Sequence, residues 1–86
     1  MPNKTLLIIR IKPESMETEN TLQELKTIKK GELKDAKEET IGFGIKIIKA
    51  AFLVKEKEEQ AIEALLKEIN SLKTVDEAEV EGMTLL

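Results

Sequence analysis

Two apolar segments constrain the fold of this chain more than any other feature, because each carries hydrophobic side chains on both of its alternating faces. In residues 5–12, Leu7, Ile9 and Ile11 share one face, and the other face is also partly apolar. Residues 45–54 repeat this pattern, with four apolar residues on one face and three on the other. Strands that are apolar on both faces are typical of the centre of a sheet. The sequence therefore predicts two central strands.

Two further segments have the periodicity of amphipathic helices. The run Thr21-Leu22-Gln23-Glu24 fits a capping box and predicts a short helix over about residues 22–30, preceded by a polar surface loop over residues 14–20. A longer helix is predicted over residues 56–72, because one face of it collects five apolar residues: Ile62, Leu65, Leu66, Ile69 and Leu72. Each helix would bury one face against the sheet.

Two charged segments complete the pattern. Residues 35–41 predict a weak strand and residues 75–80 a short acidic strand, followed by a tail over residues 81–86. Charged strands suit the edges of a sheet, where they discourage association between molecules. The resulting order predicts an α+β, ferredoxin-like β-α-β-β-α-β sandwich with an antiparallel sheet of order 4-1-3-2 and both helices on one face. We expect a single domain over residues 1–86.

The composition excludes several kinds of site. The chain has no cysteine and no histidine, so it lacks thiolate chemistry and the commonest transition-metal ligand. A formal net charge of −3, with no Tyr or Trp, argues against a nucleic-acid-binding surface. No calcium-loop, nucleotide-binding or nucleophile motif is present. These features predict a protein that is not an enzyme, that needs no metal or other cofactor and that does not bind nucleic acid directly.

The apolar stretch near the N-terminus, residues 6–11, is interrupted by Arg10. It is too short for the hydrophobic region of a signal peptide or for a membrane span. We therefore expect a cytoplasmic protein without a membrane partner.

The stretch from Thr40 to Lys46 places Phe43, one of only two aromatic residues, between Gly42 and Gly44. Glycine permits the positive-φ conformations of a tight bend, so this stretch predicts a rigid turn between two strands. Two interpretations of Phe43 remain open. The ring either folds back onto the core of its own domain or is presented to a partner, as aromatic interface anchors are.

The string Ile41-Gly42-Phe43-Gly44-Ile45-Lys46 resembles the signature of the guanine-nucleotide exchange domain of elongation factor 1-beta. The resemblance extends to Ile11-Lys12-Pro13 at the end of the first predicted strand, to the Asn20-Thr21-Leu22 helix start and to the final strand with its short tail. It covers nearly the whole chain in the order and length of the elements. A domain of this size resembles the archaeal members of the family.

This resemblance implies a partner, elongation factor 1-alpha, which is the GTPase that delivers aminoacyl-tRNA to the ribosome. Members of the family speed the replacement of its GDP by GTP, and their aromatic ring, here Phe43, inserts into the GTPase domain. We expect the exchange domain to be a monomer on its own. The partner-binding residues that the resemblance implies are Gly42, Phe43, Gly44, Ile45, Lys46, Lys12, Leu85 and Leu86.

The C-terminal tail departs from the family pattern. Well-studied relatives have a lysine next to the C-terminal residue, and its ammonium group enters the Mg²⁺ site of the partner. Here Leu85 occupies that position and no lysine follows Lys73, so the role of this lysine cannot be carried over. The tail either acts by its shape or packs on its own domain, and we expect packing.

An alternative function is a small-ligand-binding regulatory domain on the same fold. Such modules usually hold their ligand at a glycine-rich turn after the first strand. Here that turn is Pro13-Glu14-Ser15-Met16, which has no glycine. An RNA-binding domain of this topology would present aromatic side chains on its central strands. Phe52, however, is expected to face the core.

Overall fold

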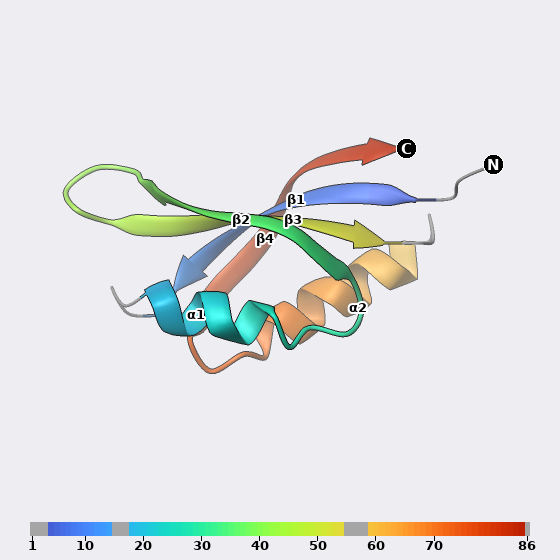
Figure 1. Cartoon of the computed structure of the whole chain (residues 1–86), viewed down its shortest axis with the longest axis horizontal. Helices are drawn as coiled ribbons and strands as arrows, with labels where there is room; N and C mark the ends of the chain where they lie inside the picture. Colours follow the sequence, from blue (N-terminus) through green and yellow to red (C-terminus); the bar gives the residue numbers. More distant parts are fainter. Residues whose placement is uncertain (1–3, 15–17, 55–58, 86) are drawn as a thin grey trace.

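The computed structural model describes residues 4–14, 18–54 and 59–85, and its elements follow the predicted order (Figure 1). The strands and helices are β1 (Thr5–Pro13), α1 (Thr18–Leu25), β2 (Glu32–Thr40), β3 (Lys46–Val54), α2 (Glu59–Asn70) and β4 (Val75–Leu85). This arrangement is the predicted α+β, ferredoxin-like β-α-β-β-α-β fold.

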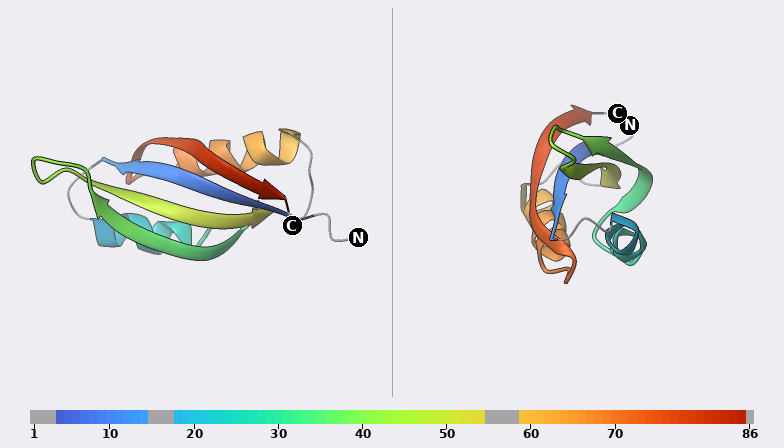
Figure 2. Two further views of the ribbon diagram at one scale, coloured as in Figure 1. Left: turned by 90° about the horizontal axis from the view of Figure 1, so that it is seen from above. Right: turned by 90° about the vertical axis from the view of Figure 1, so that its left-hand side faces the viewer.

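The four strands form one antiparallel sheet with the order β2-β3-β1-β4, which is the predicted order 4-1-3-2 read from the other edge. The register places Ile9 of β1 opposite Ala50 of β3 and Val80 of β4. Both helices lie on one face of the sheet (Figure 2). In the described part of the chain, no other element covers the opposite face, which we call the open face.

The core lies between the sheet and the helices. Side chains alternate between the two faces of the sheet along β1 and β3, so every second side chain of these strands points into the core. Phe52 has no exposed surface, so it faces the core as predicted and cannot serve as a stacking platform for RNA. Helix α2 contributes Leu65 and Ile69, both fully buried. The cluster of buried residues comprises Leu7, Ile9, Ile11, Leu25, Ile48, Ala50, Phe52, Val54, Leu65, Ile69, Val75 and Ala78.

Helix α1 begins and ends several residues before the range predicted for it, so the predicted surface loop over residues 14–20 is wrong in its last part. The predicted capping box is also wrong, because Thr21 and Glu24 lie inside the helix and bond to a distant residue. The Thr21 hydroxyl donates to the carbonyl oxygen of Thr74 at 3.3 Å, and Glu24 accepts from the Thr74 backbone N–H at 3.0 Å. The two side chains therefore tie α1 to the loop between α2 and β4.

The C-terminal segment is strand where a tail was predicted. Strand β4 continues to Leu85, whose backbone lies opposite Thr5 of β1. A register shift between Ile8 and Ile9 accommodates the extra residue Glu81 in β4, as in a β-bulge. The segment thus packs on its own domain, as expected, through strand pairing.

The other boundaries differ by a few residues. Strand β2 begins at Glu32, before the predicted residue 35, and α2 ends at Asn70 where residue 72 was predicted. Residues 56–58 of the longer predicted helix lie outside the described residues. Neither helix in the described ranges is long and apolar enough to cross a membrane.

Candidate functional site

The Gly42-Phe43-Gly44 loop joins β2 to β3 and projects beyond the helical layer (Figure 1). All three residues have a positive φ, at 117° for Gly42, 51° for Phe43 and 76° for Gly44. Two backbone hydrogen bonds of 2.9 Å close the loop, from the Ile41 N–H to the Ile45 carbonyl and from the Ile45 N–H to the Gly42 carbonyl. The positive φ explains why both flanking positions are glycine. Lack of space does not, because a methyl group at either position would meet nothing within 4 Å.

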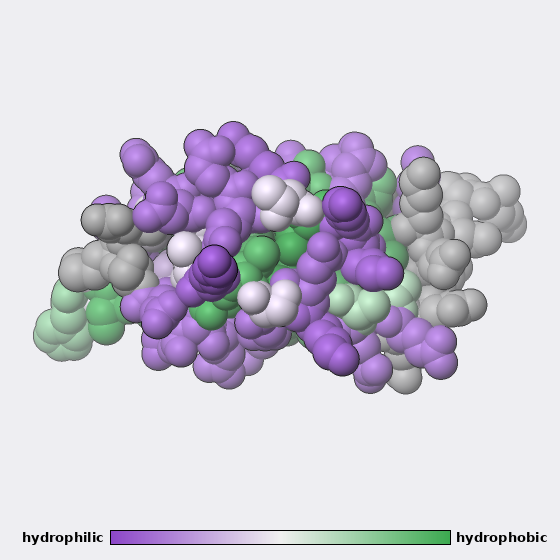
Figure 3. Space-filling model, turned by 90° about the horizontal axis from the view of Figure 1, so that it is seen from below, coloured by the Kyte–Doolittle hydropathy of each residue, from purple (hydrophilic) through white to green (hydrophobic). Residues whose placement is uncertain are grey.

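Phe43 is completely exposed, with a relative accessibility of 106%, so the interpretation in which its ring folds back onto the core is wrong. Ile41 and Ile45 on either side of the loop are about half exposed, at 45% and 49%. We call these three side chains the apolar tip. Figure 3 shows hydrophobic surface at this projecting end, separated by hydrophilic residues from the hydrophobic centre of the helical face. Contiguous exposed apolar side chains are typical of interaction sites.

A polar cluster holds the base of the hairpin on the helical side. Lys46 lies 3.8 Å from the Glu38 carboxylate, which also accepts a hydrogen bond from the hydroxyl of Thr18 at the start of α1. Lys46, predicted as a partner-binding residue, is thus on β3 directly after the loop and is partly engaged with β2. The cluster links α1 to both strands of the hairpin.

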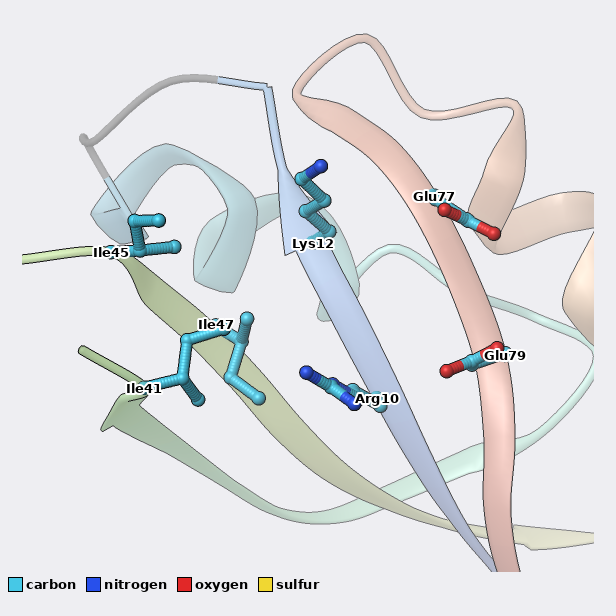
Figure 4. Close-up of a pocket in the computed structure, with 7 residues that line it drawn as sticks. All are labelled: Arg10, Lys12, Ile41, Ile45, Ile47, Glu77 and Glu79. Atoms are coloured by element: carbon cyan, nitrogen blue, oxygen red, sulfur yellow. The ribbon is translucent and has the colours of Figure 1, made fainter. Parts of the chain in front are cut away.

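A hollow of about 340 Å³ lies on the open face beside the root of the hairpin (Figure 4). Its first wall is apolar and consists of Ile41, Ile45 and the buried Ile47. The remaining lining is charged, with Arg10 and Lys12 from β1 and Glu77 and Glu79 from β4. The hollow therefore brings Lys12, a predicted site residue, to the same end of the molecule as the apolar tip.

Ion pairs cross the open face next to this hollow. Lys49 of β3 lies 3.1 Å from the Glu39 carboxylate of β2 and 3.4 Å from the Glu81 carboxylate of β4. The hydrogen bond from Lys49 to Glu39, and to a smaller extent the one to Glu81, raises the pKa of Lys49 above its ordinary value. Lys12 has a longer and more exposed pair with Asp76, at 3.8 Å.

The structure brings together six of the eight predicted site residues, namely Lys12, Gly42, Phe43, Gly44, Ile45 and Lys46. It separates these from Leu85, which ends β4 beside the start of β1, at the opposite end of a molecule 43 Å long. Leu86 lies outside the described residues. One compact contact cannot include both Phe43 and Leu85.

Sequence reasoning missed Arg10 as part of this region. Its position on a predicted central strand suggested a minor interruption of an apolar run, and only the pairing of β1 with β3 and β4 places it beside the isoleucines. One signal was available, because Arg10 is the only arginine among the 14 basic residues.

Other kinds of site find little support in the described ranges. No group of three or more carboxylates in residues 4–14, 18–54 and 59–85 is arranged to hold a metal ion. The turn after β1, where a ligand-binding regulatory module would hold its ligand, includes residues 15 and 16, which lie outside the described residues.

The fold and the exposed loop together define a small ferredoxin-like domain with an aromatic-tipped hairpin. Comparison with known families gives a more specific result, since the EF-1 guanine nucleotide exchange domain matches residues 6–86. The chain belongs to this family, whose role is guanine nucleotide exchange in translation elongation. A comparison with curated proteins finds no match.

Proposed function

We propose that this domain promotes the exchange of GDP for GTP on elongation factor 1-alpha in the cytoplasm, without covalent chemistry of its own. The observation that carries the proposal is the complete exposure of Phe43 in a loop whose backbone fixes its direction. Family membership supplies the type of reaction. The partner surface comprises the apolar tip, Lys46 and Lys12.

The mechanism follows from a rigid aromatic wedge. Because the loop is already ordered in the free domain, docking of Phe43 costs little conformational entropy. The ring stabilises a conformation of the GTPase in which the contacts to phosphate and Mg²⁺ are poorly formed, and this raises the dissociation rate of GDP. Coupling is reciprocal, so nucleotide weakens binding of the domain by the same factor, and incoming GTP releases it.

The proposed mechanism acts through Phe43 and does not involve Leu85. The backbone of Leu85 is engaged with Thr5 of β1, at the far end from Phe43. Disturbance of Mg²⁺ therefore arises through the conformation that Phe43 selects. Leu85 would touch the partner only through a separate contact, at the other end of the molecule.

The decisive experiment is stopped-flow fluorescence with elongation factor 1-alpha loaded with a fluorescent GDP analogue. Wild-type domain should accelerate release of the analogue in the presence of excess GTP. Phe43→Ala should reduce this acceleration by roughly 30-fold, since loss of an aromatic hot spot costs about 2 kcal/mol or more. Its melting temperature should stay close to that of the wild type, because the Phe43 ring is completely exposed.

A matched control is Lys34→Gln, which changes one exposed side chain on edge strand β2, away from the hairpin loop. It should accelerate release as well as the wild type does. Absence of acceleration by the wild-type domain at micromolar concentration would refute the proposed function, and full activity of Phe43→Ala would refute the wedge mechanism.

A further inference from the structure

Arg10, the only arginine of the chain, lies half-buried in the middle of the open face. Its neighbours across the strands are Lys49 of β3 and Glu79 of β4. Among the described residues, no carboxylate forms an ion pair with Arg10 within 4.0 Å. The nearby carboxylates of Glu39 and Glu81 are engaged with Lys49. Within residues 4–14, 18–54 and 59–85, the partly buried guanidinium group therefore has no paired carboxylate.

The surroundings of Arg10 favour a carboxylate as the missing partner. In Figure 4 its side chain extends toward Ile47 and away from Glu79, so the guanidinium group points toward the apolar wall of the hollow. Arginine presents a planar fork that matches both oxygens of a carboxylate, whereas lysine presents a single charged point. An apolar wall also excludes water from the pair once the hollow is covered, which strengthens the interaction.

The hollow is continuous with the apolar tip. Ile41 and Ile45 line it and also bracket the loop that carries Phe43. A protein that encloses the Phe43 ring must therefore lie over or beside the hollow. This continuity selects the occupant, which is the same protein that binds the ring.

Resting on the proposed function, we infer that this hollow is a second contact for the elongation GTPase, in which Arg10 binds a side-chain carboxylate of that protein. The apolar wall accommodates the aliphatic part of the acidic residue. Glu79 lines the same hollow and opposes the incoming negative charge, so it limits the affinity of the contact.

Removing the charge of Arg10 and removing the charge of Glu79 should change the affinity for the GTPase in opposite directions. Arg10→Gln should weaken binding to nucleotide-free elongation factor 1-alpha by about tenfold, because it removes a charge-assisted hydrogen-bonded pair. Arg10→Lys should retain part of the affinity, since it keeps the charge and loses the fork. Glu79→Gln should instead tighten binding by about threefold, because it removes a like charge beside the bound carboxylate.

Isothermal titration calorimetry at low and high salt measures these effects, and thermal melting of each variant confirms that it is folded. Lys37→Gln is the matched control. Lys37 lies on edge strand β2 opposite Lys49, which in turn lies opposite Arg10, so the substitution removes one exposed positive charge from the same row of residues across the sheet. It should change the affinity by less than about twofold. The loss in Arg10→Gln should shrink at high salt, where the wild-type pair is screened.

The outcomes separate this inference from the proposed function. If Arg10→Gln and Glu79→Gln both bind like the wild type while Phe43→Ala binds weakly, the second contact is refuted and the proposed function stands. Reversed signs, with Arg10→Gln tighter and Glu79→Gln weaker, would show that the hollow binds a basic group and would also refute the inference. A wild-type domain that does not bind the GTPase would overturn both.

Discussion

Phe43 combines an exposed ring with a left-handed backbone, and neither feature stabilises the free domain. An L-residue other than glycine is uncommon at positive φ, and an exposed phenylalanine gains nothing from burial. Such costs persist in proteins mainly at sites that use them. The φ of 117° at Gly42 is still more restrictive than that of Phe43, because it lies outside the left-handed helical region.

Gly42→Ala should therefore strain the loop by about 1 to 2 kcal/mol without changing any packing contact. Because the loop projects from the core, the strain should appear as local opening. The amides of Ile41 and Ile45, which make the two loop hydrogen bonds, should exchange with solvent about five- to thirtyfold faster.

Gly44→Asn is the control for this change, because φ at Gly44 is 76° and asparagine tolerates the nearby left-handed region. Hydrogen-exchange mass spectrometry or NMR resolves the two variants. Equal protection of these amides in Gly42→Ala and in the wild type would show that the loop is not held by its backbone conformation.

At this scale the sequence predicted the turn and its residues but left the direction of the Phe43 ring open. The Gly-Phe-Gly string specifies a bend, whereas exposure depends on how far the hairpin extends past α1, which no local pattern encodes. Arg10 was harder to predict, because its neighbours Lys49 and Glu79 are 39 and 69 residues away and become adjacent only through strand pairing.

Among the elements, α1 shows how a distant partner can override a local signal. Thr21 and Glu24 have the spacing of a capping box, yet both bond to Thr74, fifty residues or more along the chain. The hydrogen bonds from the Thr74 side chain and backbone hold the pKa of Glu24 below its ordinary value of 4.5. The ionised form of Glu24 therefore stabilises the fold more than the protonated form does.

This linkage predicts a pH dependence. Since the pKa of Glu24 is lower in the folded than in the unfolded state, its stabilising contribution is present above about pH 4.5 and disappears as the pH falls through the lowered value. Glu24→Gln should melt at a lower temperature than the wild type at pH 7, and the difference should shrink as the pH is lowered below 4.

Circular dichroism melting curves between pH 7 and about pH 3 measure this difference. Glu63→Gln, on the exposed side of α2, is the control and should not show the same dependence. A difference between Glu24→Gln and the wild type that stays constant across this range would contradict the proposed linkage.

The elements that could be predicted from the sequence are those whose pattern reflects burial. The apolar faces of β1 and β3 and the first four residues of the predicted stripe, which lie in α2, follow directly from strand and helix periodicity. The fifth, Leu72, lies after the end of α2. The C-terminal part of β4 could not be predicted in this way, because Glu81, Gly82 and Thr84 have no strand pattern. This part of β4 is stabilised by pairing with β1 across a bulge, which the local sequence does not show.

At the scale of the whole molecule, ion pairs connect the strands on the open face of the sheet, which no helix covers in the described part of the chain. Lys49 bridges β2 and β4 across the central strands through Glu39 and Glu81. The bulge at Glu81 places its carboxylate on this face. The ion pairs thus connect the two edges of the sheet.

Lys49→Gln should lower the melting temperature at neutral pH, because it removes both pairs and leaves two carboxylates on the same face. The pKa of Lys49 is raised in the folded state, so its contribution is complete below its ordinary value of 10.5 and is lost as the pH rises through the raised value. The difference from the wild type should therefore narrow in strongly alkaline solution. Melting curves from pH 7 to about pH 11.5 test this, with Lys37→Gln as the control.

If Lys49→Gln and Lys37→Gln melt at the same temperature at pH 7, the cross-sheet pairs contribute nothing measurable. Such a result is common for isolated surface ion pairs. It would mean that the sheet is stabilised by strand pairing and by the core on the helical side, without help from these pairs.

The left-handed backbone at Phe43 also limits how such a domain can diversify. Since the ring is completely exposed, other large residues could replace it with little effect on folding. Residues branched at Cβ are the exception, because valine, isoleucine and threonine are severely disfavoured at a φ of 51°. Relatives that recognise a different protein through this loop should therefore draw on tyrosine, tryptophan, leucine or methionine at this position.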